Sequence, residues 1–280
     1  MSAVARGQFE LLDRMADGNP WLDMTSNTPN TTSLILACQN GHTKIAQRLI
    51  NDGANIETKG NGGRRALAWA AVEERPQIIK LLIKAGADVN AKNKLGETAL
   101  MEVSRLGNVK IVKLLLDRNA DLNDVANDGR AALFFATEEN DVEIVDLLLR
   151  RGARADHANT VGERALDVAV AFNFYDCAGK LLKAGANPNR RLRVQDADAS
   201  YPARSLTYLA YLVKTNNTQM ASLFLEHGAD PYRLSKSAKT AFDFVGHDNS
   251  EMALLLALHT ADKIDAATPG LKRQTQRKRF

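Results

Sequence analysis

Five histidines and two cysteines are the residues of this chain best suited to acid–base, nucleophilic or metal chemistry. Such side chains become reactive only when other groups converge on them. None of the histidines has a partner at a suitable sequence spacing: His42, His157, His227, His247 and His259. The sequence also lacks GxxxxGKS/T and GxGxxG phosphate loops, the HExxH zinc motif and CxxC pairs. We therefore expect no catalytic residue, no metal and no cofactor.

The positive charge of the chain is concentrated at its C-terminal end. The 280 residues include 37 Lys and Arg against 33 Asp and Glu, which gives a formal charge of +4. Five of the bases lie within residues 272–279, and without them the net charge is −1. A body this close to neutral lacks the basic footprint of a nucleic-acid-binding domain, so only the tail at 272–279 could contact nucleic acid.

The overall composition excludes several classes of protein. With 45% hydrophobic and 25% charged residues, the chain is not a wholly disordered protein. No apolar run reaches the roughly 18–20 residues of a membrane span, and charges come too early at the N-terminus for a secretory signal. Two cysteines are too few for a disulfide scaffold. We therefore expect a cytoplasmic monomer without membrane insertion.

The sequence repeats itself every 33 residues. A glycine followed by alanine closes each repeat, and asparagine takes its place once: Gly53, Gly86, Asn119, Gly152, Gly185 and Gly228. A large apolar residue near the start of each repeat keeps the same step at Leu34, Leu67, Leu100, Leu133 and Leu166, and after ten extra residues the series continues with Leu209 and Phe242. The step from Gly185 to Gly228 is 43 residues, so one junction carries ten extra residues. A fixed period of this length predicts stacked copies of one supersecondary unit.

Residues 95–123 show the repeating unit most clearly. Thr98 can cap the start of a first helix, and Gly107 and Asn108 follow as a turn. Apolar or small residues at helical spacing predict the inward positions of two helices: Leu100, Val103 and Ser104, then Ile111, Leu114 and Leu115. The residue before Ala120 should end the second helix in a left-handed conformation, which glycine adopts most readily and asparagine next. The polar residues that follow should form a projecting turn, which we call a finger.

These repeats resemble the ankyrin repeat family. The family's TPLHLAA-like helix start appears as TALMEVS at 98–104 and RALAWAA at 65–71, and its GADVN ending appears at 86–90. The resemblance covers about residues 4–258. The capping threonine is replaced at three places: Arg65, Ala131 and Arg164. The resemblance implies an all-α ankyrin-repeat solenoid of about seven helix-turn-helix units with inter-repeat β-turn fingers. It also implies a non-enzymatic module for protein–protein interaction.

This organisation predicts three segments. Residues 1–25 form an N-terminal capping half-repeat, residues 26–260 form the repeat array, and residues 261–280 form a disordered basic tail. The ten-residue excess falls within 186–206 and is either a recognition element or a tolerated insertion, because loops vary in length at little cost. The tail is a solubilising segment, a nuclear-localisation-like patch, or a weak contact for nucleic acid or anionic lipid.

Both cysteines fall at positions that the repeat predicts to be buried. Cys38 aligns with Ala71 and Ser104 at a tight helix-packing position, and Cys177 aligns with Ile78 in the core. They are four repeats apart, which is too far for a disulfide. We expect both to act as small apolar residues.

The family resemblance places partners on a concave side formed by the fingers and first helices. The period predicts the side chains there: the aromatic residues Trp69, Phe135, Phe172 and Tyr211, the acidic residues Glu73, Glu102, Glu138 and Glu139, and Arg105. Aromatic anchors with charged neighbours are typical of interface hot spots. We therefore predict a groove for a peptide that bears apolar anchors and some Lys or Arg. Alternatively, the aromatic residues pack against the next repeat and the glutamates form a solvated face.

The fingers carry the opposite charge. Their basic side chains are Lys59, Arg64, Lys92, Lys94 and Arg130. They either keep the protein soluble or form a rim that steers an acidic partner, and we include Lys94 and Arg130 among the partner-binding candidates. The sequence thus indicates a scaffold, an inhibitor or a translocated effector in the cytoplasm, the nucleus or a host cell. The alternative is a regulatory or nucleic-acid-associated factor that uses the basic tail and the fingers.

Overall fold

The structure is a computed structural model that describes residues 31–192, 206–246 and 249–267, with side chains up to residue 260. It divides into two compact units, Met1–Ala165 and Leu166–Phe280. The predicted N-terminal cap at 1–25 lies outside the described residues. The first helix that can be described is therefore α2.

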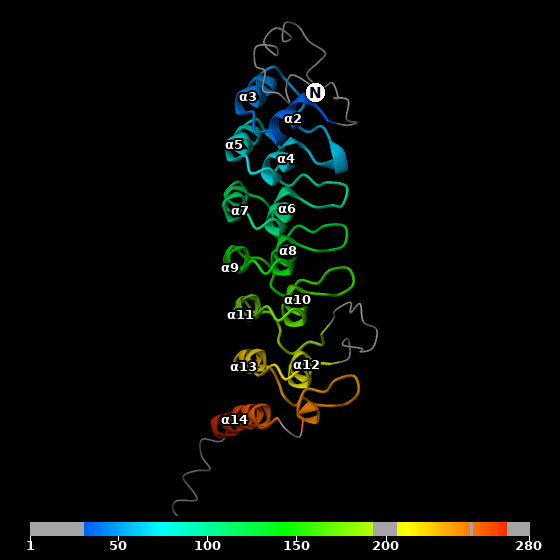
Figure 1. Cartoon of the computed structure of the whole chain (residues 1–280), viewed down its shortest axis with the longest axis vertical. Coiled ribbons are helices and arrows are strands. Elements are labelled where there is room, and N and C mark those ends of the chain that lie inside the picture. Colours follow the sequence, from blue (N-terminus) through cyan, green and yellow to red (C-terminus); the bar gives the residue numbers. More distant parts are fainter. Residues whose placement is uncertain (1–30, 193–205, 247–248, 268–280) are drawn as a thin grey trace, which may run out of the picture. The chain divides into compact units, whose positions relative to one another are not determined.

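Unit 1 consists of helix pairs joined by tight turns. The first helices are α2 (Ser33–Gln39), α4 (Ala66–Val72), α6 (Ala99–Arg105) and α8 (Ala132–Glu138). The second helices are α3 (Thr43–Asn51), α5 (Pro76–Lys84), α7 (Val109–Leu116) and α9 (Val142–Arg150), and the finger before α4 contains the 3-10 turn η2 (Asn61–Gly63). Figure 1 shows the first helices in one row and the second helices in another, with the fingers projecting beside the first row. Each pair therefore packs on the next along the unit.

Unit 2 uses the same arrangement. Its helices are α10 (Ala165–Ala171), α11 (Tyr175–Lys183), α12 (Tyr208–Lys214), α13 (Thr218–Glu226), the 3-10 turn η4 (Phe242–Phe244) and α14 (Ser250–Ala267). Helix α14 continues to Ala267, beyond the boundary at 260 that sequence analysis gave for the array. The reason is that the first helix-breaking residues after Ser250 are Pro269 and Gly270. The rest of the predicted tail, 268–280, lies outside the described residues.

The helix ends in unit 1 follow the capping chemistry that the sequence predicts. The Thr98 hydroxyl accepts a hydrogen bond from the Met101 N–H at 3.4 Å. Arg65 and Ala131, which stand in place of threonine, make no side-chain cap bond. The residues that end the second helices are left-handed, with φ of 88° at Gly53 and 63° at Asn119. The spaced glycines thus mark one backbone conformation that recurs in every repeat.

The core lies between the two rows of helices. Leu100, Val103, Ser104, Ile111 and Leu115 are buried as predicted. Leu114 is only half-buried, and its neighbours Val112 and Leu116 are buried instead, because α7 contacts both α6 and α9. Cys38 and Cys177 are both buried, as expected. Burial raises the pKa of the Cys38 thiol to about 12, so this thiol stays protonated and unreactive.

A ladder of backbone hydrogen bonds links the fingers of unit 1. Lys94 N donates to Gly62 O at 2.8 Å, and Asn127 N donates to Leu95 O at 2.9 Å. Thr160 N donates to Asp128 O at 2.9 Å, which repeats the contact one finger further on. Gly129 sits at this last contact with φ of 82°, and a Cβ there would lie 2.8 Å from Thr160 N. The close approach of successive fingers therefore requires glycine at this position.

The all-α prediction is confirmed. Residues 31–192, 206–246 and 249–267 contain helices and two isolated β-bridges, but no extended strand. None of the described helices has the length and apolar character needed to cross a bilayer. Within the same residues, no three His, Cys, Asp or Glu side chains are grouped so that they could hold a metal ion.

Candidate functional site

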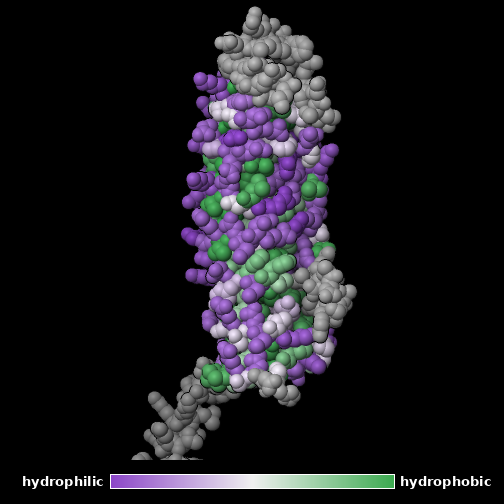
Figure 2. Space-filling model, in the orientation of Figure 1, coloured by the Kyte–Doolittle hydropathy of each residue, from purple (hydrophilic) through white to green (hydrophobic). Residues whose placement is uncertain are grey.

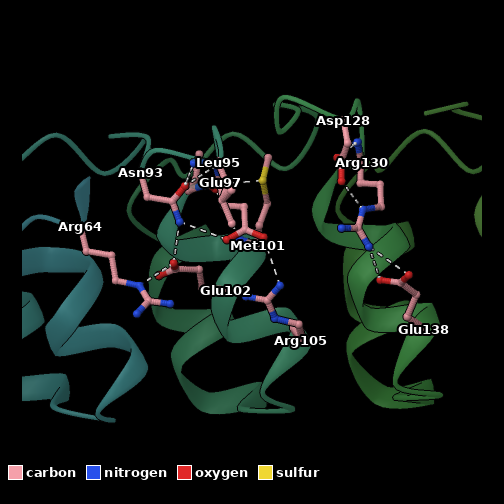
Figure 3. Close-up of polar contacts among 11 residues, drawn as sticks. Arg64, Asn93, Leu95, Glu97, Met101, Glu102, Arg105, Asp128, Arg130 and Glu138 are labelled. Atoms are coloured by element: carbon pink, nitrogen blue, oxygen red, sulfur yellow. Dashed lines mark hydrogen bonds and ion pairs between the residues drawn. The ribbon is translucent and has the colours of Figure 1, made fainter. Parts of the chain in front are cut away.

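Most of the predicted partner-binding residues lie on the first helices of unit 1 and on the fingers before them. We call this surface the inner face, and its members are Arg64, Trp69, Glu97, Glu102, Arg105, Arg130, Phe135 and Glu138. Figure 3 shows its polar network. Three arginines dominate it, and each guanidinium group bonds to a carboxylate and lies against an aromatic ring. The inner face is therefore an ordered layer of cations over rings and acids.

Glu102 of α6 is the most deeply buried acid of the inner face, with 1% of its surface exposed. Its Oε1 accepts hydrogen bonds from Arg64 Nε at 2.7 Å and from Asn93 Nδ2 at 2.8 Å. Its Oε2 is buried and has no hydrogen-bond partner. Burial raises the pKa of the Glu102 carboxyl, although Arg64 and Asn93 act in the opposite direction. Glu102 is thus an internal anchor for the arginine.

Arg64 also covers Trp69. Its guanidinium carbon lies 4.9 Å from the centroid of the indole ring, which is within cation–π range. Trp69 is half-buried, and its Nε1 is buried without a hydrogen-bond partner. The ring therefore supports the arginine from below and is only partly open to a partner.

Arg105 and Arg130 enclose Phe135 of α8. Their guanidinium carbons lie 5.3 Å and 4.5 Å from the centroid of the phenyl ring. Phe135 is 1% exposed, so the expectation that its ring lines an open groove is wrong. The reason is that arginine side chains from two repeats fold over the same ring. Its assignment to partner binding stays a prediction, and any effect on a partner would pass through the arginines.

The remaining bonds of Arg105 and Arg130 go to carboxylates of their own repeats. Arg105 Nη1 donates to Glu97 Oε1 at 3.1 Å, and Glu97 is buried. Arg130 Nε donates to Asp128 Oδ2 at 2.7 Å, and its Nη1 donates to Glu138 Oε2 at 2.8 Å. Partial burial raises the pKa of Glu138, against the influence of Arg130. The glutamates predicted to attract a cationic peptide are therefore partly engaged by the protein's own arginines.

Other predicted residues of unit 1 lie at its edges. Glu73 and Glu139 follow α4 and α8 as C-caps, where Glu73 is half-buried and Glu139 exposed. Lys94 is exposed on its finger. Lys92, in contrast, is bound to Asp124 through Nζ at 2.6 Å. The basic side chains of the fingers are therefore not a uniform free rim.

Two predicted aromatic residues belong to unit 2. Phe172 is 64% exposed and stacks on Phe174, with 5.7 Å between the ring centroids. Tyr211 is half-buried on α12. Phe172 is thus the one predicted aromatic residue, among those that the structure describes, with most of its surface open to solvent.

The enlarged finger at 186–206 is described only at its ends. Leu192 N donates to Leu206 O at 3.0 Å, and Arg191 forms an isolated bridge with Thr207. Residues 193–205 lie outside the described part of the chain. The two described ends of this finger are therefore paired with each other.

Sequence reasoning missed Glu97 as a member of the inner face, and it missed Asn93 and Asp128 as partners of Glu102 and Arg130. A signal was present, because Arg64, Glu97 and Arg130 occupy the same place in successive repeats with alternating charge. The pairs Glu97–Arg105 and Arg130–Glu138 also share a spacing of eight residues with the charges reversed. Reading charge along the 33-residue period would have found this network.

Helix pairs that stack at a fixed period, with linked fingers, define an all-α repeat protein. The chain matches the family model for ankyrin repeats (three copies) over residues 1–93 and 100–192. It is also similar to the crystal structure of an ankyrin repeat domain from Acinetobacter baumannii AYE, with 28% identity and a TM-score of 0.61. The similarity covers 66% of this chain and 96% of that one. No curated protein matched this chain. Since the family model covers more than half of its residues, the chain belongs to the ankyrin repeat family.

Proposed function

We propose that the chain is a protein-binding module and that the inner face of unit 1 contacts the partner. Ankyrin repeats generally mediate protein–protein interaction, and this supports the class of function. The observation that supports the place is the layer of three arginines, held by carboxylates and rings on α4, α6 and α8. Arginine and tryptophan are common in interface hot spots, and side chains that are already ordered lose little entropy on binding.

The proposed contacts divide into two groups. Solvent-accessible groups would touch the partner: Trp69, Glu73, Lys94, Arg105, Arg130, Glu138 and Glu139. Glu102 and Phe135 would act from beneath, because they fix the arginines in place. Phe172 and Tyr211 of unit 2 are proposed as a separate contact patch. The role of the chain as a scaffold, an inhibitor or a translocated effector, and its place in the cytoplasm, are part of the same proposal.

A displayed library of random peptides, selected against the whole chain, tests the place of binding. The inner-face variant carries Leu106→Ser and Glu139→Lys at the edge of the inner face, and these changes affect exposed side chains and spare the core. The matched control carries Lys110→Glu and Lys113→Glu on the exposed side of α7. Selected peptides should bind the wild type and the control and lose affinity for the inner-face variant. Peptides that bind all three proteins equally would contradict the proposal. Alanine at Phe135 is unsuitable for this test, because removing a buried ring destabilises a fold.

A further inference from the structure

We infer that the inner face of unit 1 takes an acidic protein segment that also carries an apolar side chain. The carboxylates of this segment would bind the free N–H groups of Arg64, Arg105 and Arg130. This inference rests on the proposed function and adds the chemistry of the partner to it. It replaces the basic peptide that the sequence pattern favoured.

The first observation is that the three guanidinium groups have unused donors. Arg64 makes its side-chain hydrogen bond through Nε alone, so neither of its Nη atoms has a protein partner. Arg105 bonds only through Nη1, and Arg130 leaves Nη2 unbonded. The side chains are 30%, 36% and 27% exposed, respectively. None of these nitrogen atoms is fully buried, so each has some surface open to solvent.

The second observation is the burial of the acids that pair with Arg64 and Arg105, whereas Asp128 and Glu138, which pair with Arg130, are 46% and 34% exposed. Glu102 and Glu97 lie beneath the arginines, with 1% and 4% of their surfaces exposed. They neutralise the guanidinium groups from the protein side, and an incoming cation cannot reach them without displacing an arginine. An incoming carboxylate meets accessible N–H donors first. At Arg64 and Arg105, burial of the paired acids therefore favours an acidic ligand over a basic one.

The arginines are also oriented before a ligand arrives. Arg64 lies on Trp69, and Arg105 and Arg130 lie on Phe135. A guanidinium group fixed in this way presents a planar set of donors that can pair with a carboxylate through two hydrogen bonds. Lysine carries the same charge but lacks this geometry. Charge and geometry can therefore be separated by experiment.

The edge of the same face indicates why the ligand should be a peptide. Leu106, directly after Arg105, is 55% exposed at the end of α6 and offers an apolar contact. Glu73 and Glu139 occupy the corresponding place in the neighbouring repeats. Over unit 1, Figure 2 shows isolated hydrophobic patches in a predominantly hydrophilic surface. A nucleic acid carries a charge on every phosphate and would be repelled by these glutamates, whereas a peptide can place single carboxylates on the arginines.

Direct titration with two synthetic peptides tests the inference. One peptide alternates glutamate and leucine in a short fluorescein-labelled chain, and the other carries lysine in place of every glutamate. Both are titrated into the full chain by fluorescence anisotropy at low and at physiological salt, and single-stranded DNA serves as a third probe. The glutamate peptide should bind best, with affinity that falls as salt rises, because part of the attraction is between exposed charges.

Two matched triple variants separate geometry from charge. Arg64→Lys, Arg105→Lys and Arg130→Lys preserve the charge above Glu102 and Glu97 and remove the paired donors. Arg118→Lys, Arg150→Lys and Arg151→Lys make the same exchange at exposed positions that end α7 and α9. The inner triple variant should bind the glutamate peptide about tenfold more weakly, and the outer variant should bind it like the wild type. Circular dichroism verifies that both variants are folded.

Several outcomes would overturn the inference. These are tighter binding of the lysine peptide, tighter binding of DNA, no binding of the glutamate peptide at low salt, and equal affinities of the two folded triple variants. If library-selected peptides depend on the inner face but are basic, this inference fails and the proposed function stands. If selected peptides ignore the inner face, the proposed function fails as well.

Discussion

Arg64 donates its Nε–H to Glu102 across a repeat boundary, with 2.7 Å between nitrogen and oxygen. The two residues are 38 positions apart in the sequence and belong to the repeats of α4 and α6. The Glu102 carboxylate otherwise accepts a hydrogen bond only from Asn93, at the same oxygen atom. The ion pair therefore joins two repeats through a carboxylate that has little access to water.

For this reason, removing the Arg64 side chain should strongly destabilise the fold. Arg64→Ala leaves the charge of Glu102 buried without its cation, and we expect a loss of about 3–5 kcal/mol in the free energy of unfolding. Arg48→Ala, which breaks an exposed pair with Asp52 on α3, should lose less than about 1 kcal/mol. Urea unfolding followed by circular dichroism measures both. In the double variant with Glu102→Gln, much of the Arg64→Ala loss should disappear, and simple additivity would contradict the coupling.

The pH dependence of stability should carry a signature of Glu102. Burial raises its pKa, so the folded chain binds this proton more readily than the unfolded chain does. The carboxyl therefore contributes most stability below its unfolded pKa and loses this contribution as the pH rises through the folded pKa. We expect the unfolding free energy of the wild type, relative to Glu102→Gln, to increase as the pH falls from neutrality toward 4.5, the ordinary value. The exposed Glu143→Gln serves as control, and a difference that shrinks on acidification would refute this assignment.

The finger ladder should be sensitive to a methyl group at Gly129. Gly152→Ala introduces only backbone strain, because its φ is 97° and nothing lies near the added Cβ. It should cost about 1–2 kcal/mol. Gly129→Ala adds a clash with the backbone of Thr160 and should cost about 1–3 kcal/mol more. Thermal unfolding of the two variants compares them, and equal losses would show that the fingers move apart without penalty.

Glu74 is a position where the chain can be stabilised. It ends the turn between α4 and α5 with φ of 56°, whereas the same turn contains Gly41, Gly107 and Asn140 in neighbouring repeats. Because glutamate is strained in this region and asparagine is tolerated better, Glu74→Asn should stabilise unit 1 by about 1 kcal/mol. Glu73→Asn, at a residue with φ of −86°, should have little effect. Midpoints of urea unfolding distinguish the two, and no gain at Glu74 would contradict the role of strain.

The fold can be predicted well from the sequence, because the recurring residues mark positions where the backbone needs a particular conformation. The 33-residue step of glycine and Asn119 marks the left-handed ends of the second helices, where few residue types are tolerated. Leu114 was placed inward on a simple three–four spacing and is half-buried. Such a spacing predicts one apolar stripe, whereas α7 buries Val112 and Leu116 as well, because it packs between neighbouring helices.

The candidate site was less predictable for a different reason. The period places Cα atoms, but it does not indicate where a long side chain from one repeat ends on the next. Phe135 was predicted on the correct helix but is covered by Arg105 and Arg130. Glu102 lies on the predicted first helix, but its partner Arg64 comes from the preceding repeat. Which of these side chains are exposed to solvent therefore follows from the structure and not from the 33-residue period.

The contacts across the repeat boundaries of unit 1 have a consequence for how such a chain can change. Arg64 meets a carboxylate in the next repeat, whereas Arg105 meets a phenyl ring one boundary further on. The backbones of the repeats are nearly alike, but the side-chain contacts differ from one repeat boundary to the next. Exchanging the order of two repeats would keep the helices but would separate Glu102 from Arg64. The order of the repeats is thus specified by the side-chain contacts between them and not by their backbone shape.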